Sequence, residues 1–255
     1  MTPLYYERRG EGPPLLLLHA TLSSSRQLRT LATRLAATNT VVSIDRRGSG
    51  LSTFEGPAGP IAVTTHVEGL LGIIDAEGLG PVTVVGHSFG GCIALELAGR
   101  RPELVRAVFA YEPPYAQVAP RAVREGMAEV GHRTLAANDE GGLEAAALTF
   151  MEGVSGAEAV ADLSPAARAR VERAGQGAVA DATLLGMDPD CLARISCPVG
   201  IATGTASAPL YAEIAEALVS RIPAAEHLRL AGADHMAPVL RPDAVAAVIS
   251  GLLEA

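Results

Sequence analysis

Ser88 lies in the pattern Gly-x-Ser-x-Gly, which residues 86–90 (GHSFG) complete. The preceding residues 82–85 (VTVV) are β-branched and largely apolar, which predicts a buried strand, and residues 92–98 combine helix formers with one apolar face. We therefore expect a sharp strand-to-helix turn that exposes Ser88 as a nucleophile, with glycines that let strand and helix approach. The backbone N–H of Phe89 would face a substrate carbonyl oxygen, because a helix N-terminus favours the negative charge of an acyl-transfer transition state.

A match to this pattern can also arise by chance, since the chain contains 27 glycines. Two further observations favour catalysis. The motif falls between a predicted strand and a predicted helix, and His235 follows a short predicted strand far downstream. A histidine in such a loop can act as the general base that a serine nucleophile requires. We expect the other histidines to be ordinary core or surface residues.

The segments around the motif have the order expected of a parallel sheet. Residues 15–18 (LLLL) and 41–44 (VVSI) are short apolar runs suited to strands buried on both faces, and residues 27–37 between them have helical spacing. Strand, helix, strand is the βαβ unit of a parallel sheet. Further strands are predicted at residues 4–8, 105–111, 199–203 and 226–230, and further helices at 63–77, 209–221 and 242–253.

The stretch from Tyr115 to about Arg194 differs from the rest of the chain. It is rich in Ala, Arg, Glu and Gly and contains helical segments with no convincing strand. Ser164 followed by Pro165 predicts a helix start, because serine is a good N-cap and proline is favoured at the first helical position. The predicted domains are therefore a core of residues 1–114 and 195–255 and a helical cap inserted at 115–194.

Composition limits the possible partners and location. The chain has 255 residues, a formal net charge of −8 and a pI near 5.3, which disfavours nucleic acid and anionic membrane surfaces. Its three cysteines do not form a disulfide framework, and no metal-ligand spacing occurs. Residues 1–9 hold no apolar signal core, and no window approaches the roughly 18 apolar residues of a membrane span. We expect a cytoplasmic monomer or homodimer that acts on a small molecule and needs no metal or cofactor.

Four segments together resemble the α/β-hydrolase superfamily, in its branch of small capped serine hydrolases that includes haloperoxidase-like esterases and bacterial lactonases. They are residues 15–20 (LLLLHA), 45–52 (DRRGSGLS), the turn at Ser88, and residues 232–235 (GADH). The order serine, acid, histidine also suits this superfamily. The resemblance implies a mostly parallel twisted sheet flanked by helices, with a helical cap inserted between two strands.

The resemblance also implies roles for the loop after residues 15–18. The backbone N–H of Thr21 would be the second oxyanion donor beside that of Phe89, and His19 would hold the loop together. Ala20 stands where the family usually has glycine, and alanine is poorer at positive φ. We interpret residues 45–47 (DRR) as a salt-linked turn that holds loops around the pocket.

The acid that would orient His235 is the least clear member of the site. Relatives usually carry an aspartate shortly after the strand that corresponds to 199–203, but residues 204–209 (GTASAP) contain no carboxylate. A minority of the superfamily takes its acid from the end of the strand after the nucleophile helix, where Glu112 stands before two prolines. Glu112 could instead cap the entrance of the inserted segment. Ser207 could hold His235 through a neutral hydrogen bond, and Asp188 and Asp190 are weaker candidates.

These side chains predict acyl transfer, in which Ser88 attacks an ester, thioester or lactone and water activated at His235 hydrolyses the acyl-enzyme. Serine as nucleophile argues against the related epoxide hydrolases and haloalkane dehalogenases, which use aspartate. Two alternatives remain: a small-molecule receptor with slow turnover, and a C–C hydrolase or cyclase that acts on an enol or β-diketone. Only 4% of residues are aromatic, which favours an aliphatic pocket. Its candidate lining residues, each equally consistent with plain core, are Leu22, Phe89, Tyr115, Phe150, Met151, Met187 and Met236.

Overall fold

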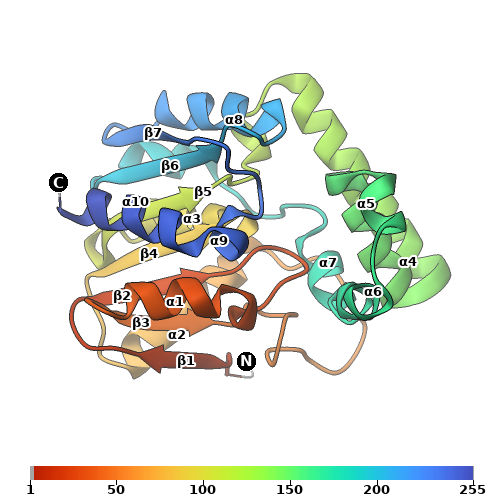
Figure 1. Ribbon diagram of the computed structural model, residues 1–255, viewed down its shortest axis with the longest axis horizontal. Coiled ribbons are helices and arrows are strands. Elements are labelled where there is room, and N and C mark those ends of the chain that lie inside the picture. The colour runs from red at the N-terminus through yellow and green to blue at the C-terminus, as the bar shows by residue number, and fades with distance from the viewer. Residues whose placement is uncertain (1–2, 255) are drawn as a thin grey trace.

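A computed structural model describes residues 3–254 of the protein, and the strands in this range form one seven-stranded sheet (Figure 1). The strand order is β1-β3-β2-β4-β5-β6-β7. Strand β1 (Tyr6–Arg9) runs antiparallel to β3 (Thr40–Ile44), and every other pairing is parallel. The α/β-hydrolase fold expected from the sequence is confirmed, with a mostly parallel sheet between two layers of helices.

Strand β2 (Pro14–Leu18) explains why the sheet needs helices on both faces. Side chains alternate along a strand, so Leu15 and Leu17 pack on one side with α1 (Arg29–Leu35) and α10 (Pro242–Glu254). Leu16 and Leu18 pack on the other side with α2 (Val63–Ala76) and α3 (Phe89–Arg100). All four leucines are at most 1% exposed, as the uninterrupted apolar run predicts.

The remaining core elements lie close to their predicted places. They are β4 (Val82–His87), β5 (Val105–Tyr111), β6 (Val199–Gly204), α8 (Pro209–Val219) and β7 (Ala225–Leu230), with 3₁₀ turns at Ser25–Leu28 and Pro102–Leu104. The helix predicted over 27–37 begins as the first of these 3₁₀ turns, and a short helix α9 (Ala237–Leu240) was not predicted. Four residues are too few to show a helical period in sequence.

Between β5 and β6, a stretch that the structure describes in full, the chain contains helices joined by loops, and no strand. The helical elements are a 3₁₀ turn (Ala116–Val118), α4 (Arg121–Ser155), α5 (Ala157–Ala161), α6 (Pro165–Glu172), α7 (Gly175–Asp181) and a second 3₁₀ segment (Pro189–Arg194). Figure 1 shows α4 to α7 beyond the carboxyl ends of the parallel strands. Helix α6 begins as predicted, because the Ser164 hydroxyl accepts the N–H of Ala167 at 3.3 Å. The division into core and cap stays a prediction, and residues 1, 2 and 255 of the predicted core lie outside the described range.

A buried carboxylate on α3 holds both ends of the helical segment. One oxygen of Glu96 accepts the Tyr115 hydroxyl and, at 2.8 Å, the backbone N–H of Asp188, while the other accepts Arg100 Nε at 2.7 Å. Burial, followed by the nearby Glu96 charge, raises the pKa of Tyr115, which keeps this phenol a hydrogen-bond donor. The start and end of the insertion are thus both bonded to α3.

Candidate active site

Ser88 occupies a strained turn between β4 and α3. Its backbone has φ 54° and ψ −123°, a conformation that costs a non-glycine residue about 1–3 kcal/mol. The turn is held because the Ser88 N–H donates to the carbonyl of Tyr111 at 2.8 Å. The flanking glycines are required, since a Cβ on Gly86 would lie 2.3 Å from the carbonyl oxygen of Gly90. The strand-to-helix turn predicted from the sequence is therefore present in this geometry.

Positive φ angles gather near this turn. Within residues 3–254 four non-glycine residues have positive φ: Leu22, Ser88, Glu112 and Leu184. The first three are candidate site residues. Such conformations persist where the surrounding structure over-determines them, and they cluster at functional sites. No sequence pattern indicated the strain at Leu22 or Glu112.

Glu112 and His235 meet although 123 residues separate them. Glu112 Oε2 lies 2.7 Å from Nδ1 of His235, and Oε1 accepts the backbone N–H of Gly204 at 2.8 Å. The carboxyl side chain is fully buried, whereas the imidazole is 24% exposed. A carboxylate can only accept, so this contact places a proton on Nδ1 and leaves Nε2 as the free, basic nitrogen.

The other candidate partners of His235 have different surroundings. The Ser207 hydroxyl is buried without a hydrogen-bond partner among the described residues, and Nδ1 of His235 faces Glu112. Asp188 accepts the N–H of Asp190 at 3.1 Å at the start of the 3₁₀ segment, so both belong to the end of the insertion. Among these candidates, Glu112 is the one that contacts His235.

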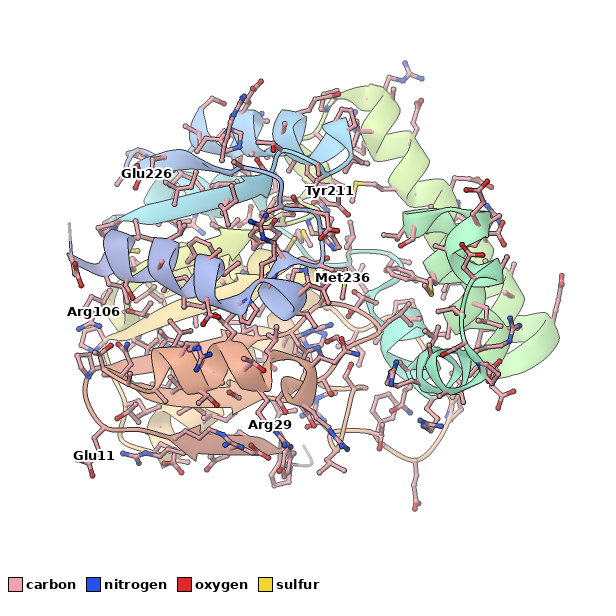
Figure 2. The ribbon with its side chains drawn as sticks, in the orientation of Figure 1. Glu11, Arg29, Arg106, Tyr211, Glu226 and Met236 are labelled. Carbon is pink, nitrogen blue, oxygen red and sulfur yellow. The ribbon has the colours of Figure 1, made fainter. Side chains whose placement is uncertain are left out.

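Two residues that the sequence did not single out hold His235. His87, next to Ser88, donates through Nε2 to the carbonyl of His235 at 2.8 Å, and the two ring centroids lie 4.9 Å apart. Burial lowers the pKa of His87 well below its usual value, so its ring is neutral. Tyr211 of α8 stacks on the His235 imidazole, with 4.7 Å between ring centroids and 14° between planes. Figure 2 labels Tyr211 and Met236, and both lie at the end of the sheet that is nearer to α4 to α7.

The loop that carries His235 is also fixed through its backbone. The hydroxyl of Tyr111, at the end of β5, donates to the carbonyl of Asp234 at 2.7 Å. Asp234 turns its own carboxylate to the N–H of Met236 at 2.9 Å, so it stabilises the loop and not the imidazole.

The loop after β2 lies against the turn at Ser88. A Cβ on Gly90 would stand 2.6 Å from the carbonyl oxygen of Leu18 and 2.7 Å from that of His19, so only glycine allows this approach. Phe89 is the first residue of α3, where a backbone N–H has no acceptor within the helix. Ala20 is absent from the residues with positive φ, so alanine here carries no backbone strain. The strained residue is Leu22, two positions later.

His19 holds this loop internally, as expected. Its Nδ1 lies 2.7 Å from the carbonyl oxygen of Ala20, and its Nε2 accepts the N–H of Arg46 at 3.0 Å. Burial and then the charge of Arg46 lower the pKa of His19 well below its usual value. A neutral ring with a proton on Nδ1 satisfies both contacts.

The turn at residues 45–47 differs from its prediction in one respect. The carboxylate of Asp45 accepts the backbone N–H groups of Ser25 at 2.7 Å and Leu51 at 2.8 Å. The ion pair of this turn is formed instead by Arg46 with Asp181 of α7. Asp45 therefore shapes the turn through main-chain amides, while Arg46 links it to the helical insertion.

The predicted pocket residues have different surroundings. Tyr115 is fully buried in the main core cluster with its hydroxyl on Glu96, so we assign it to packing. Met187 packs at the edge of that cluster, Phe150 and Met151 are half-buried on α4, and Met236 is 39% exposed beside His235. Leu22 is half-buried in the strained loop, and Phe89 is fully buried.

A family model described as the alpha/beta hydrolase family matches residues 15–248. The chain belongs to this family. A crystal structure of an alpha/beta hydrolase from Sphaerobacter thermophilus is 30% identical, with a TM-score of 0.78 and coverage of 98% of this chain and 96% of that one. An enol-lactonase from Burkholderia xenovorans has the same fold at 20% identity, with a TM-score of 0.78 over 99% of this chain and 96% of that one.

Similarity to curated hydrolases covers shorter segments. Lipase LipV of Mycobacterium tuberculosis is 35% identical over 115 residues, which are 44% of this chain and 42% of that protein. A 2-hydroxymuconate semialdehyde hydrolase of Pseudomonas putida is 42% identical over 101 residues, 38% of this chain and 35% of that protein. The matches thus span about two fifths of the length of these relatives. Within residues 3–254 no helix is both long and apolar enough to cross a membrane.

Proposed function

We propose that this α/β-hydrolase is a serine hydrolase that cleaves a small ester, thioester or lactone through an acyl-enzyme on Ser88. The observation that carries this proposal is the contact between the buried Glu112 carboxylate and Nδ1 of His235. It supplies the acid that is missing from residues 204–209. The similarity to a lipase and the shared fold with an enol-lactonase are consistent with such a substrate.

Acylation follows from the protonation state of His235. Nε2 takes the proton of the Ser88 hydroxyl as Oγ attacks the substrate carbonyl carbon, and Glu112 stabilises the imidazolium that forms. The carbonyl oxygen becomes an oxyanion that accepts the N–H groups of Thr21 and Phe89, the latter at the positive end of α3. When the tetrahedral intermediate collapses, the imidazolium gives its proton to the leaving alcohol, thiol or lactone oxygen.

Deacylation repeats these steps with water. His235 removes a proton from the water that attacks the acyl carbon, and the imidazolium then returns a proton to Ser88 as the acid leaves. His87 bonds the backbone carbonyl of His235 and Tyr211 stacks on its imidazole, so both steps use one ring position. A preset ring reduces the entropy lost in reaching the transition state.

The proposal is tested first at Ser88. Ser88→Ala should abolish hydrolysis of p-nitrophenyl acetate and butyrate and leave the melting temperature nearly unchanged, because the hydroxyl performs chemistry and packs little. A fluorophosphonate probe should add to Ser88 of the wild type, as read by mass spectrometry. Labelling of another serine, or full activity in Ser88→Ala, would overturn the assignment.

A C–C hydrolase is the second candidate, favoured by the similarity to the 2-hydroxymuconate semialdehyde hydrolase. The same serine and histidine would then act on an enol or β-diketone. Turnover of such a substrate with no steady hydrolysis of esters would favour this candidate. The contact of Glu112 with His235 also favours an enzyme over a small-molecule receptor with slow turnover, because it gives the imidazole a carboxylate partner.

A further inference from the structure

A buried ion pair joins the helical insertion to the core beside the candidate site. Arg46 follows β3, and Asp181 is the last residue of α7. The guanidinium donates through Nη1 to Asp181 Oδ1 at 3.0 Å and through Nη2 to Oδ2 at 2.7 Å, and both side chains are at most 2% exposed. A buried pair of this kind is stable only where the remaining donors and acceptors are also bonded.

Those remaining groups are bonded to the loop after β2. Arg46 Nε donates to the carbonyl of His19 at 3.0 Å, and the Thr21 hydroxyl donates to Asp181 Oδ2 at 2.7 Å. The ion pair therefore holds the residues on both sides of Ala20. Asp181 holds the segment that carries the Thr21 N–H through the Thr21 side chain, and Arg46 holds it through the main-chain carbonyl of His19.

The same pair also contacts the other proposed oxyanion donor. The guanidinium carbon of Arg46 lies 5.0 Å from the ring centroid of Phe89, within range of a cation–π contact. The His66 ring lies nearly perpendicular to that ring, with 5.7 Å between the centroids. Phe89 is thus held from the side of Arg46 while its N–H stays at the start of α3.

We propose that Asp181 is a positioning residue that acts through Thr21 and Arg46 to set the oxyanion hole. The insertion would then contribute to catalysis as well as cover the site, because α7 supplies the carboxylate that aims the Thr21 N–H. This inference rests on the proposed serine hydrolase function. It assigns the carboxylate of Asp181 to transition-state stabilisation and not to substrate binding.

The first test removes the contact with the least disturbance. Thr21→Val keeps the shape and the backbone N–H but deletes the hydroxyl that reaches Asp181. We expect kcat on p-nitrophenyl butyrate to fall about tenfold to a hundredfold with KM nearly unchanged, somewhat less than the loss of an entire oxyanion donor. Thr21→Ser restores the donor and should recover most of that loss. Thr33→Val, which deletes an exposed hydroxyl bonded within α1, is the matched control and should behave as wild type.

A second readout does not depend on activity. Amide hydrogen exchange of the peptide that covers residues 19–23 should be faster in Thr21→Val and in Asp181→Asn than in wild type and Thr33→Val. Wild-type kcat together with wild-type exchange in Thr21→Val would overturn the proposal. So would a loss of kcat that Thr21→Ser does not recover, because that loss would not arise from the hydroxyl.

The two proposals fail in different ways. If the wild type hydrolyses no ester and Ser88 is not labelled by a fluorophosphonate, the serine hydrolase function is wrong. The rate of amide hydrogen exchange at residues 19–23 in Asp181→Asn then decides whether Asp181 orders this loop. Unchanged exchange would refute the positioning role under either activity.

Discussion

Replacing Glu112 by glutamine removes the charge that faces His235 while it keeps the size of the side chain. Glu112 makes two contacts, one oxygen accepting the N–H of Gly204 at 2.8 Å and the other lying 2.7 Å from His235 Nδ1. In the glutamine variant the amide oxygen must stay on Gly204, because the N–H there needs an acceptor. The amide NH₂ then faces Nδ1 and forces this nitrogen to accept.

The consequence is a change of tautomer at His235. With Nδ1 accepting, the proton moves to Nε2, which can no longer take the proton of Ser88. An amide replacement of this kind, with the geometry kept, lowers turnover by roughly 10⁴. We therefore expect kcat/KM for p-nitrophenyl butyrate to fall by about 10⁴, which corresponds to about 5 kcal/mol of transition-state stabilisation.

The assay compares Glu112→Gln with Ser207→Ala at neutral pH, and both variants are melted to verify folding. Ser207→Ala should keep most activity, because its hydroxyl bonds to no described residue. The rate of fluorophosphonate labelling at Ser88 should fall in parallel with kcat/KM in Glu112→Gln. If a folded Glu112→Gln keeps more than about a tenth of wild-type activity, the acid assignment is wrong.

Two further predictions concern the buried histidine beside the ion pair and the inserted helices. Burial, then the charge of Arg46, lowers the pKa of His66 to about 4, so the unfolded chain binds more protons than the folded one between about pH 6.5 and 4. The free energy of unfolding should therefore decrease by about 3 kcal/mol as the pH is lowered through that window. Denaturant titrations should show a shallower fall in His66→Gln, and an equal fall would contradict this. If the insertion sets substrate size, Phe150→Ala on α4 should raise the ratio of kcat/KM for octanoate esters to that for acetate esters. Val154→Ala, at an exposed position of the same helix, should leave this ratio unchanged. An unchanged ratio in Phe150→Ala would count against a cap.

Local patterns in the sequence predicted most of the fold. The run of leucines at 15–18 predicted a strand with two buried faces, because successive side chains point to opposite faces and here all of them are apolar. Glycines around Ser88 predicted the turn, since a Cβ at Gly86 or Gly90 would collide with backbone. Such features depend on neighbours in the chain, so they can be read without the tertiary structure.

Contacts across long separations could be predicted only in part. Glu112 was one of several possible partners for His235, because a sequence gives the types of acids but not their distances. The stacking of Tyr211, the support from His87 and the pairing of Arg46 with Asp181, 135 residues apart, had no sequence signal. Polar groups with many possible partners are paired by the packing of the whole chain, whereas apolar periodicity and tight turns are set locally. The sequence by itself therefore determined the sheet, the turn at Ser88 and the candidate base, and the tertiary structure alone decided which carboxylate meets His235 and which helix reaches Thr21.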